Sequence, residues 1–294
     1  MIRRTNDFIK VTNVKVFAYH GVLPEEQKNG QEFFLNAKVY VNTKKASQTD
    51  ALEHTVNYDE MTSIMHDSFR ENVYQLIEAA GEHVIQSVMH YYPNIEAMEL
   101  EVRKPNAPVR LQPEDVSVTL YREWHRVYVS FGSNYENDEV GYINDTYEIL
   151  KANDFFRGIK PSELVRTKPY GPVAQADFVN GCFEMDTLFE PEELMEYFRG
   201  IEDGFERDRS IKWGPRPIDL DVLFYDDIVY HSNIVNIPHM DMQNRMFVLL
   251  PLSELCPGMR HPLIGKTVVQ MKAELEEKGG MEDILGEVDW VIWS

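Results

Sequence analysis

A strict alternation of apolar and polar residues in one short segment most constrains how this chain can fold. In "QEFFLNAKVYVN" (31–42) every second side chain is apolar. These residues are Phe33, Leu35, Ala37, Val39 and Val41. Successive side chains of a strand point to opposite faces, so a period of two marks a strand with one buried face. The segment is therefore predicted to be a half-buried β-strand.

The segments on either side of this strand predict a first block with the order ββααββ. A strand is predicted over 8–18 and a turn over 20–30, and two helices follow the alternating strand. The second helix, within 73–92, carries a helical apolar stripe. Alternating strands over 97–103 and 115–122 close the block.

A second block of strands and helices begins directly after the first. Strands are predicted over 126–132 and 177–187, and helices over 139–153 and 191–205. A strand with two aspartates follows. Because the strands mostly pair without long parallel crossovers, the predicted class is α+β.

The two blocks predict two domains, residues 1–123 and 124–280, followed by an acidic tail over 281–294. Residues 274–289 contain seven acids and one lysine, so we expect a helical end that passes into a loosely held tail.

Composition and charge exclude several classes of protein. The net charge of −20 opposes nucleic acid as a general partner, because duplex binding depends on a basic surface. No run approaches the roughly 18 apolar residues needed to span a bilayer. Two cysteines, Cys182 and Cys256, are too few for a disulfide framework, and no secretory signal begins the sequence. A cytoplasmic location is expected.

Two carboxylates interrupt the apolar segment "WGPRPIDLDVLFYDD" (213–227). Asp219 and Asp221 lie two residues apart in a strand and share a face, about 7 Å from each other. The residues expected on the opposite face are Ile218, Leu220, Val222 and Phe224. Two like charges on one face need a cation between them. The segment therefore predicts a positive partner.

A basic segment and a histidine loop supply candidates for that partner. Residues 207–216, "RDRSIKWGPR", carry four positive side chains and one aspartate. No P-loop and no G-x-G-x-x-G motif occurs. Magnesium commonly uses one or two carboxylates together with substrate phosphates, so a metal–phosphate substrate is one interpretation. An exposed strand edge, or a salt bridge between the aspartates and Arg216, is the alternative.

Several separated motifs of the second block resemble one enzyme family. They are "FGSN" (131–134), "FVNGCF" (178–183), "WGPRPIDLDVLFYDD" and "IPHMDMQNRMFVLLPL" (237–252). Together, over about residues 125–275, they resemble the hydroxymethyl-dihydropterin pyrophosphokinases of folate biosynthesis. The resemblance implies a ferredoxin-like α/β fold and transfer of diphosphate from ATP to the pterin's hydroxymethyl oxygen, leaving AMP.

This resemblance also implies roles for individual residues. Two magnesium ions that bridge the ATP phosphates are held by Asp219 and Asp221. The residues implied to hold ATP or the reacting phosphates are Arg207, Arg209, Trp213, Arg216, His239 and Arg245. The residues implied to hold the pterin are Asn180, Phe247 and the backbone near Thr167 and Tyr170. Taken singly, Arg207 and Arg209 suit a solvated surface, His239 a packed loop, and Trp213 and Phe247 a core.

The first block contains candidate residues rather than a self-evident site. Glu25 and Glu26 follow "HGVLP", Tyr58 lies in "TVNYDE", Glu78 in "YQLIEAAGE" and Lys104 in "VRKPNAP". The glutamates after the turn and the lysine also suit an exposed surface. A lysine that moves protons near neutral pH needs desolvation or positive neighbours, and a carboxylate beside an apolar stripe needs a hydrogen-bonding partner.

These segments, over about residues 6–123, resemble dihydroneopterin aldolases. The resemblance implies a tunnelling fold whose subunits associate through their sheets, with active sites between subunits, and cleavage of dihydroneopterin without metal or Schiff base. It implies that Glu78 anchors the pterin and that Lys104 is the general acid/base. Tyr58 assists proton transfer and Glu26 orders the reacting hydroxyl or water.

The two resemblances predict consecutive reactions in one homo-oligomer, a tetramer or an octamer. Magnesium and ATP serve the second step and the first needs no cofactor. A ferredoxin-like nucleic-acid binder is an alternative for the second block. A pterin-binding or epimerising scaffold is an alternative for the first, because epimerisation shares the retro-aldol intermediate.

Overall fold

A computed structural model describes residues 6–111, 113–135, 138–169, 175–205 and 215–289. The chain divides into two compact units, Ile2–Trp124 and His125–Ser294. This division falls one residue after the domain boundary predicted from the sequence.

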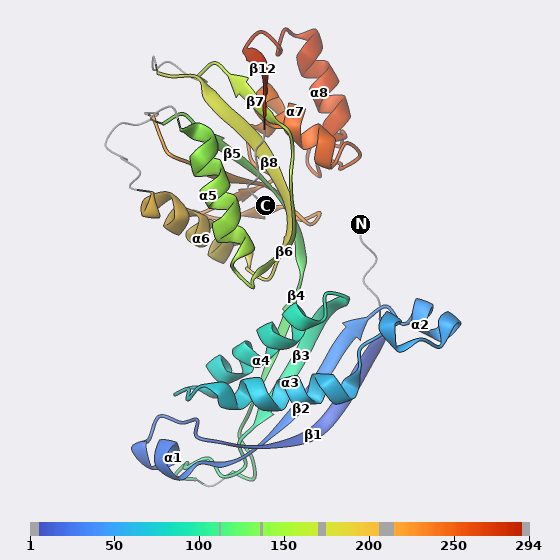
Figure 1. Ribbon diagram of the computed structural model, residues 1–294, viewed down its shortest axis with the longest axis vertical. Coiled ribbons are helices and arrows are strands. Elements are labelled where there is room, and N and C mark those ends of the chain that lie inside the picture. Colours follow the sequence, from blue (N-terminus) through green and yellow to red (C-terminus); the bar gives the residue numbers. More distant parts are fainter. Residues whose placement is uncertain (1–5, 112, 136–137, 170–174, 206–214, 290–294) are drawn as a thin grey trace. The chain divides into compact units, whose positions relative to one another are not determined.

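The first unit is a four-stranded antiparallel sheet with two helices against one face (Figure 1). The strands are β1 (Phe8–Ala18), β2 (Gln31–Val41), β3 (Ile95–Arg103) and β4 (Ser117–Glu123), in that spatial order. The helices α3 (Tyr58–Glu71) and α4 (Ile77–Tyr91) come between β2 and β3 in the sequence. The predicted order ββααββ, which is that of the tunnelling fold, is therefore confirmed.

The alternating strand has the buried face that its sequence predicts. Phe33, Leu35, Ala37, Val39 and Val41 are all at most 1% exposed. The helices cover them with apolar side chains at helical spacing, which are Met61, Met65, Phe69, Ala80, Val84, Ile85 and Val88. Burial of one side of the sheet fixes its register, because a slip of one residue would expose this whole set.

Short helices occupy two connections of the first unit. The turn predicted over 20–30 contains α1 (Pro24–Asn29), and α2 (Lys44–Thr49) and the 3₁₀ helix η1 (Leu52–His54) lie between β2 and α3. Proline suits the first position of a helix because its fixed φ matches and its missing N–H would have no helical partner. The carboxylate of Glu26 accepts a hydrogen bond from the Leu23 amide at the helix start, 3.1 Å away.

The second unit begins with the order βαβββαβ. Its elements are β5 (His125–Ser133), α5 (Glu139–Lys151), β6 (Phe156–Pro161), β7 (Leu164–Thr167), β8 (Phe178–Thr187), α6 (Pro191–Gly204) and β9 (Asp219–Tyr225). Both β6 and β7 pair with β8, which pairs with β5, which pairs with β9, all antiparallel. In this arrangement β6 and β7 together take the place of the second strand of a βαββαβ fold. This is the strand order of a ferredoxin-like sheet, as predicted.

Helices cover both faces of this sheet (Figure 1). The core on one face contains residues of α5 and α6, and the core on the other contains residues of α7 (Met246–Leu255) and α8 (Val268–Glu277). The remaining elements are β10 (Tyr230–His231), β11 (Asn236–Ile237), the 3₁₀ helix η2 (Met242–Asn244) and β12 (Ile284–Val288).

A β-bulge in β9 corrects one sequence prediction. Ile218, Leu220 and Val222 enter the α5–α6 core as expected, but Phe224 enters the α7–α8 core. Tyr128 pairs with Phe224 while Val129 pairs with Val222, which leaves Leu223 as an extra residue. An extra residue reverses the alternation beyond it, so Phe224 lies on the same face as the aspartates.

The expectation of a loosely held tail from residue 281 is wrong for residues 284–288. They form β12, which pairs antiparallel with β7 and adds a sixth strand to the sheet. Before it, the backbone amide of Lys168 donates to the Asp283 carbonyl, 3.0 Å away, and the Lys168 ammonium donates to the Glu282 carbonyl, 2.9 Å away. Backbone pairing needs no apolar side chains, which is why an acidic segment can supply this strand.

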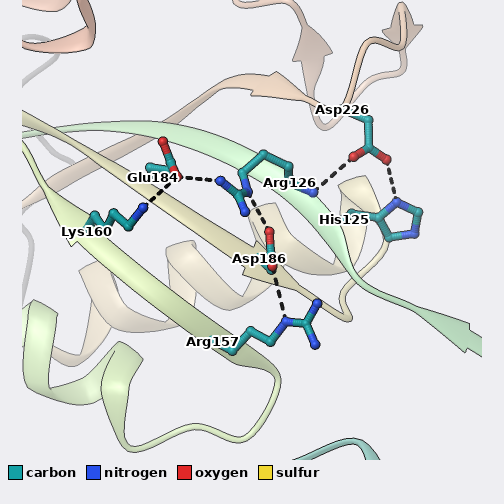
Figure 2. A network of polar contacts seen from close by, with 7 residues as sticks. All are labelled: His125, Arg126, Arg157, Lys160, Glu184, Asp186 and Asp226. Atoms are coloured by element: carbon teal, nitrogen blue, oxygen red, sulfur yellow. Dashed lines mark hydrogen bonds and ion pairs between the residues drawn. The ribbon is translucent and has the colours of Figure 1, made fainter. Parts of the chain in front are cut away.

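A charged network fixes the start of β5 (Figure 2). It comprises His125, Arg126, Arg157, Lys160, Glu184, Asp186 and Asp226. The guanidinium of Arg126 bonds the carboxylates of Glu184 and Asp186, while Asp226 bonds the His125 ring, 2.7 Å away, and the Arg126 amide, 3.0 Å away. Six residues of strand, about 20 Å, separate Arg126 from Gly132 at the other end of β5.

Across the described part of the chain, no helix combines the length and apolar character needed to cross a membrane.

Candidate active sites

The first unit brings Lys104 and Glu26 together, although 78 positions of sequence separate them. The Lys104 ammonium lies 2.6 Å from the Glu26 carboxylate, and both side chains are about nine-tenths buried. Lys104 follows the end of β3, and Glu26 lies in the first turn of α1. A carboxylate at this distance forms a charge-assisted hydrogen bond that fixes the position of the lysine nitrogen. The charge beside Lys104 is thus a carboxylate, not the positive neighbour that the sequence reasoning offered.

The environment of Glu26 favours its charged form. Burial alone would raise the pKa of Glu26, but hydrogen bonds from Lys104, the Leu23 amide and Gln31 outweigh it, so the pKa is lowered. Gly21 leaves the room that this carboxylate occupies, because an added Cβ would lie 2.4 Å from Glu26. The glycine after His20 is therefore a requirement of the site.

The other predicted residues of this unit lie at exposed helix starts. Tyr58 begins α3 and is 65% exposed, and Glu78 lies in the first turn of α4 and is exposed. Glu78 therefore meets solvent rather than the hydrogen-bonding partner that its apolar stripe suggested. Glu25 is also exposed, as its surface interpretation requires. Within one chain, the Lys104–Glu26 pair is therefore buried, whereas Tyr58, Glu78 and Glu25 are exposed to solvent.

In the second unit, one row across the sheet brings predicted metal and pterin residues to the same face. Asp219 pairs with Gly132 of β5, and Gly132 pairs with Asn180 of β8. Two strand spacings, about 10 Å, therefore separate the Asp219 and Asn180 backbones. A Cβ on Gly132 would lie 2.6 Å from the side-chain amide oxygen of Asn180. The glycine keeps the space between carboxylate and amide open.

Cationic side chains surround the two aspartates. The Arg216 guanidinium lies 3.0 Å from Asp219, so the salt bridge considered from the sequence is present. Asp221 has looser contacts, 3.8 Å to His239 and 3.9 Å to Arg245. Burial, and then the charge of Asp219, raise the pKa of Asp221, although His239, Arg245 and Arg216 act in the opposite direction.

The aspartate pair fits a magnesium–nucleotide complex better than a bare metal ion. No group of three or more His, Cys, Asp or Glu side chains is gathered for a metal ion within the described ranges. Two carboxylates on one strand face are what magnesium uses when phosphates and water complete its coordination. The raised pKa of Asp221 marks a negative charge that a further cation would stabilise.

The described pterin candidates lie on this same face or beside it. Asn180 donates to the Thr167 hydroxyl, 2.8 Å away, and both residues are buried. Phe247 lies in the first turn of α7, with the Arg245 guanidinium 5.9 Å from its ring centre. The other candidates lie outside the described residues: Tyr170, Arg207, Arg209 and Trp213.

A cavity of about 210 Å³ adjoins Asp221 and His239. Its remaining lining is mostly apolar, from Met195, Val222, Ile234, Val235, Asn236 and Met240. An apolar cavity beside charged groups suits a flat ring attached to a charged chain.

Sequence reasoning missed two residues that hold this site in place. The side-chain oxygen of Asn134 accepts a hydrogen bond from the Arg216 backbone amide, 2.9 Å away. The backbone amide of Asn134 donates to the Arg216 carbonyl, 3.2 Å away. The buried Glu202 of α6 accepts from the Leu220 amide between the aspartates, 3.0 Å away. The "FGSN" motif contained the first, but no sequence signal marked the second.

Comparison with known families divides the chain at the same place. Residues 9–121 match the family model described as dihydroneopterin aldolase. Residues 128–257 match the model described as 7,8-dihydro-6-hydroxymethylpterin-pyrophosphokinase.

Individual relatives match the whole chain or one unit. The folic acid synthesis protein fol1 of Schizosaccharomyces pombe is 26% identical over 93% of this chain and 37% of its own length. A 2-amino-4-hydroxy-6-hydroxymethyldihydropteridine pyrophosphokinase of Pseudomonas aeruginosa is 37% identical over 47% of this chain and 84% of its own. The E. coli dihydroneopterin aldolase structure in complex with neopterin covers 40% of this chain and 98% of its own, with 20% identity and a TM-score of 0.37. The chain spans well under two thirds of the length of fol1.

Proposed function

The chain belongs to the 7,8-dihydro-6-hydroxymethylpterin-pyrophosphokinase family through its second unit and carries a dihydroneopterin aldolase domain in its first, and we propose on this premise that it catalyses both reactions in succession. The first cleaves dihydroneopterin to hydroxymethyl-dihydropterin and glycolaldehyde. The second transfers diphosphate from ATP to the hydroxymethyl oxygen and leaves AMP. The product of the first reaction is then the substrate of the second.

In the first step Lys104 is the general acid/base, and the buried ion pair with Glu26 is the observation that supports this role. Lys104, as the general base, takes the proton of a side-chain hydroxyl of the substrate, and the adjacent carbon–carbon bond breaks and releases glycolaldehyde. The electron pair remains on the conjugated pterin, and a proton from Lys104 then completes the hydroxymethyl product. Glu26, held charged beside Lys104, orders the reacting hydroxyl or water.

Pterin binding in the first step falls to Glu78, with Tyr58 assisting proton transfer. A carboxylate can accept two parallel hydrogen bonds from the amino and ring N–H groups of a pterin. Both side chains are exposed within one chain, which suits a site completed by a second subunit.

In the second step Asp219 and Asp221 hold magnesium with ATP, and the row Asp219–Gly132–Asn180 is the observation that supports the assignment. Two magnesium ions, when bound, would neutralise charge on the phosphates. Arg216, His239 and Arg245 bind phosphate oxygens on the same face, and the adjoining cavity takes the base. Asn180, Phe247 and the backbone near Thr167 and Tyr170 hold the pterin, and Arg207, Arg209 and Trp213 bind ATP or the reacting phosphates. Tyr170 and these last three residues lie outside the described residues.

One incubation tests both activities. The chain is mixed with dihydroneopterin, ATP and magnesium, and glycolaldehyde, AMP and pterin diphosphate are measured together. We expect all three, with AMP formation dependent on pterin. Glycolaldehyde without AMP would contradict the second activity, and AMP only when hydroxymethyl-dihydropterin is supplied would contradict the first.

We also expect a homo-oligomer, a tetramer or an octamer, organised by the first unit. β1 and β4 are the edges of its sheet, and unpaired edges are a liability that association removes. Light scattering at micromolar concentration tests this. A monomer with full aldolase activity would contradict it.

Two alternatives have less support. A nucleic-acid binder of ferredoxin-like fold would use an open sheet face, whereas α7 and α8 cover much of the aspartate face. An epimerising scaffold shares its intermediate with the aldolase, so the ratio of epimer to glycolaldehyde in the same incubation decides. The cytoplasmic location stays a prediction.

A further inference from the structure

His20 is a buried histidine that the proposed mechanism does not use. It follows β1, is 1% exposed, and packs against the rings of Phe33, Phe69 and Tyr74. Nothing in the sequence assigns His20 a functional role, because a histidine among aromatic side chains also suits a hydrophobic core. Its hydrogen bonds separate these two possibilities.

Both ring nitrogens of His20 are engaged by backbone groups of another segment. Nδ1 accepts from the Tyr74 amide, 3.1 Å away, and Nε2 lies 2.7 Å from the Phe69 carbonyl. An amide can only donate and a carbonyl can only accept, so the ring is neutral with its proton on Nε2. The His20 side chain thus hydrogen-bonds the last turn of α3 and the connection between α3 and α4.

The backbone around His20 extends this link in two directions. The Gly21 amide donates to the Tyr74 carbonyl, 3.0 Å away, so Tyr74 is held from both sides. The His20 carbonyl accepts from the Lys104 ammonium, 3.4 Å away. Tyr74 lies four residues before Glu78 in the first turn of α4. One residue therefore contacts the proton donor and fixes the segment that carries the pterin anchor.

We propose that His20 is the positioning residue of the aldolase site, which sets Lys104 relative to Glu78 through its carbonyl and its neutral ring. This inference rests on the proposed aldolase function. It assigns His20 no contact with substrate and no proton transfer.

Burial, together with the charge of Lys104, keeps the His20 ring neutral. Lys104 is the charge that acts on His20 directly, and Lys104 is itself paired with Glu26. Burial and then Lys104 lower the pKa of His20, although the bond to the Phe69 carbonyl acts in the opposite direction. Protonation would place an N–H against the Tyr74 N–H and break the link.

Two substitutions separate positioning from simple packing. His20→Phe keeps a ring among the aromatic neighbours but removes both hydrogen bonds, and His20→Gln keeps one donor and one acceptor. We expect about a thirtyfold loss of aldolase kcat/KM in His20→Phe, divided between kcat and dihydroneopterin Kd, and recovery to within about fivefold in His20→Gln. Pyrophosphokinase activity of the same preparation, which uses the other unit, should stay unchanged.

A coupling measurement makes the test sharper. If His20 positions Glu78, then Glu78→Gln should weaken pterin binding much less in the His20→Phe background than in the wild type. Fully additive effects, or equal losses in His20→Phe and His20→Gln, would overturn the proposal. A wild-type chain without aldolase turnover would instead refute the proposed activity, and the pterin Kd values would still decide the role of His20.

A measurement on the unaltered chain covers the case in which His20→Phe does not fold. Nitrogen chemical shifts of the His20 ring report its tautomer. We expect the neutral Nε2–H form at pH 7, with and without pterin. An imidazolium or an Nδ1–H tautomer would overturn the proposal.

Discussion

The two candidate sites differ in how far their opposite charges balance. In the first unit Lys104 and Glu26 neutralise each other at 2.6 Å, both largely buried. In the second unit Asp221 is approached by His239 and Arg245 only at 3.8 and 3.9 Å, and burial together with Asp219 raises its pKa. One site is electrostatically complete in the free chain, and the other has negative charge that its own cations only partly offset.

This difference matches what each reaction has to move. A retro-aldol cleavage moves protons, which a preformed acid–carboxylate pair can do without added charge. Diphosphate transfer concentrates negative charge between two molecules, so in the proposed reaction the protein would supply carboxylates for the cations that arrive with the nucleotide. Substitutions that change charge should therefore have opposite consequences in the two units.

The largest effect is expected from Asp221→Asn, which changes one charge and almost no volume. Diphosphate transfer should fall about a thousandfold or more, because bound cations contribute several kcal/mol to such a step. Aldolase activity should not change. The melting temperature should stay the same or rise. A raised pKa means that the folded state disfavours the charged form of Asp221, and Asp221→Asn removes this charge. Both activities and melting are measured on one preparation.

A salt-bridge role for Asp221 makes the contrary prediction. The substitution would then lower the melting temperature and leave the pyrophosphokinase rate at ordinary magnesium nearly normal. That result would end the metal-site interpretation and the contrast between the two sites.

Lys104→Ala should have the next largest effect. Removal of the proton donor should lower aldolase kcat by about 10²–10⁴-fold, the range of general acid–base catalysis, with little change in pterin affinity. Lys15→Ala is the matched control, because Lys15 forms an exposed ion pair with Glu32. Stopped-flow rates measure kcat and pterin titrations measure affinity. A loss confined to pterin affinity would show that Lys104 binds the pterin and does not transfer the proton.

Glu78→Gln should weaken dihydroneopterin binding by about 10- to 100-fold, since an amide cannot accept both N–H bonds and such charged bonds contribute about 1.5–3 kcal/mol. The turnover of bound substrate should change less. Glu25→Gln, at an exposed residue of the same unit, is the control. Equal affinity losses in Glu78→Gln and Lys104→Ala would contradict the separate roles.

Gly132→Ala tests the row across the second sheet with a single methyl group. The added Cβ would lie 2.6 Å from the Asn180 side chain and would displace it. We expect the pterin KM of the pyrophosphokinase to rise about tenfold while the ATP KM changes little. Gly200→Ala in α6 is the control, because an added Cβ there meets nothing within 4 Å. Equal effects on both substrates would mean that the row does not separate pterin from nucleotide.

The smallest effect concerns stability and pH in the first unit. The pKa of His20 is lowered below 6.5 in the folded chain, so the unfolded chain binds the proton first as pH falls. The contribution of His20 to the free energy of unfolding should therefore be fully present above pH 6.5 and decrease below it, by at most about 1.4 kcal/mol per pH unit. Urea unfolding at pH 7.5 and 5.5 measures this. His20→Gln should lose the His20 part of the slope, and an unchanged slope would assign it to other groups.

The sequence predicted the periodic elements well and the irregular ones poorly. Alternation placed Phe33 to Val41 on the correct face because burial is regular along β2. The same reasoning failed at Phe224, because a bulge leaves no trace in the apolar pattern. It also missed β12, whose pairing depends on backbone groups that every residue has.

The candidate sites show the same division. Motifs predicted Asp219, Asp221 and Lys104 as site residues, and the strand period predicted that the two aspartates share a face. The pairing of Lys104 with Glu26, and the contacts of Asn134 and His20, join segments far apart in the chain. Sequence spacing carries no information about which distant backbone groups a side chain will meet.

Strand β12 has a consequence for the time at which the second unit can be completed. It pairs with β7, about 120 positions earlier, and β7 leads into the segment proposed to hold the pterin. A ribosome that adds about 5–20 residues per second needs several seconds to cover that interval. During those seconds β7 is an open edge on a growing chain, available to any other strand. The nascent chain can therefore mispair beside the residues proposed to bind the pterin.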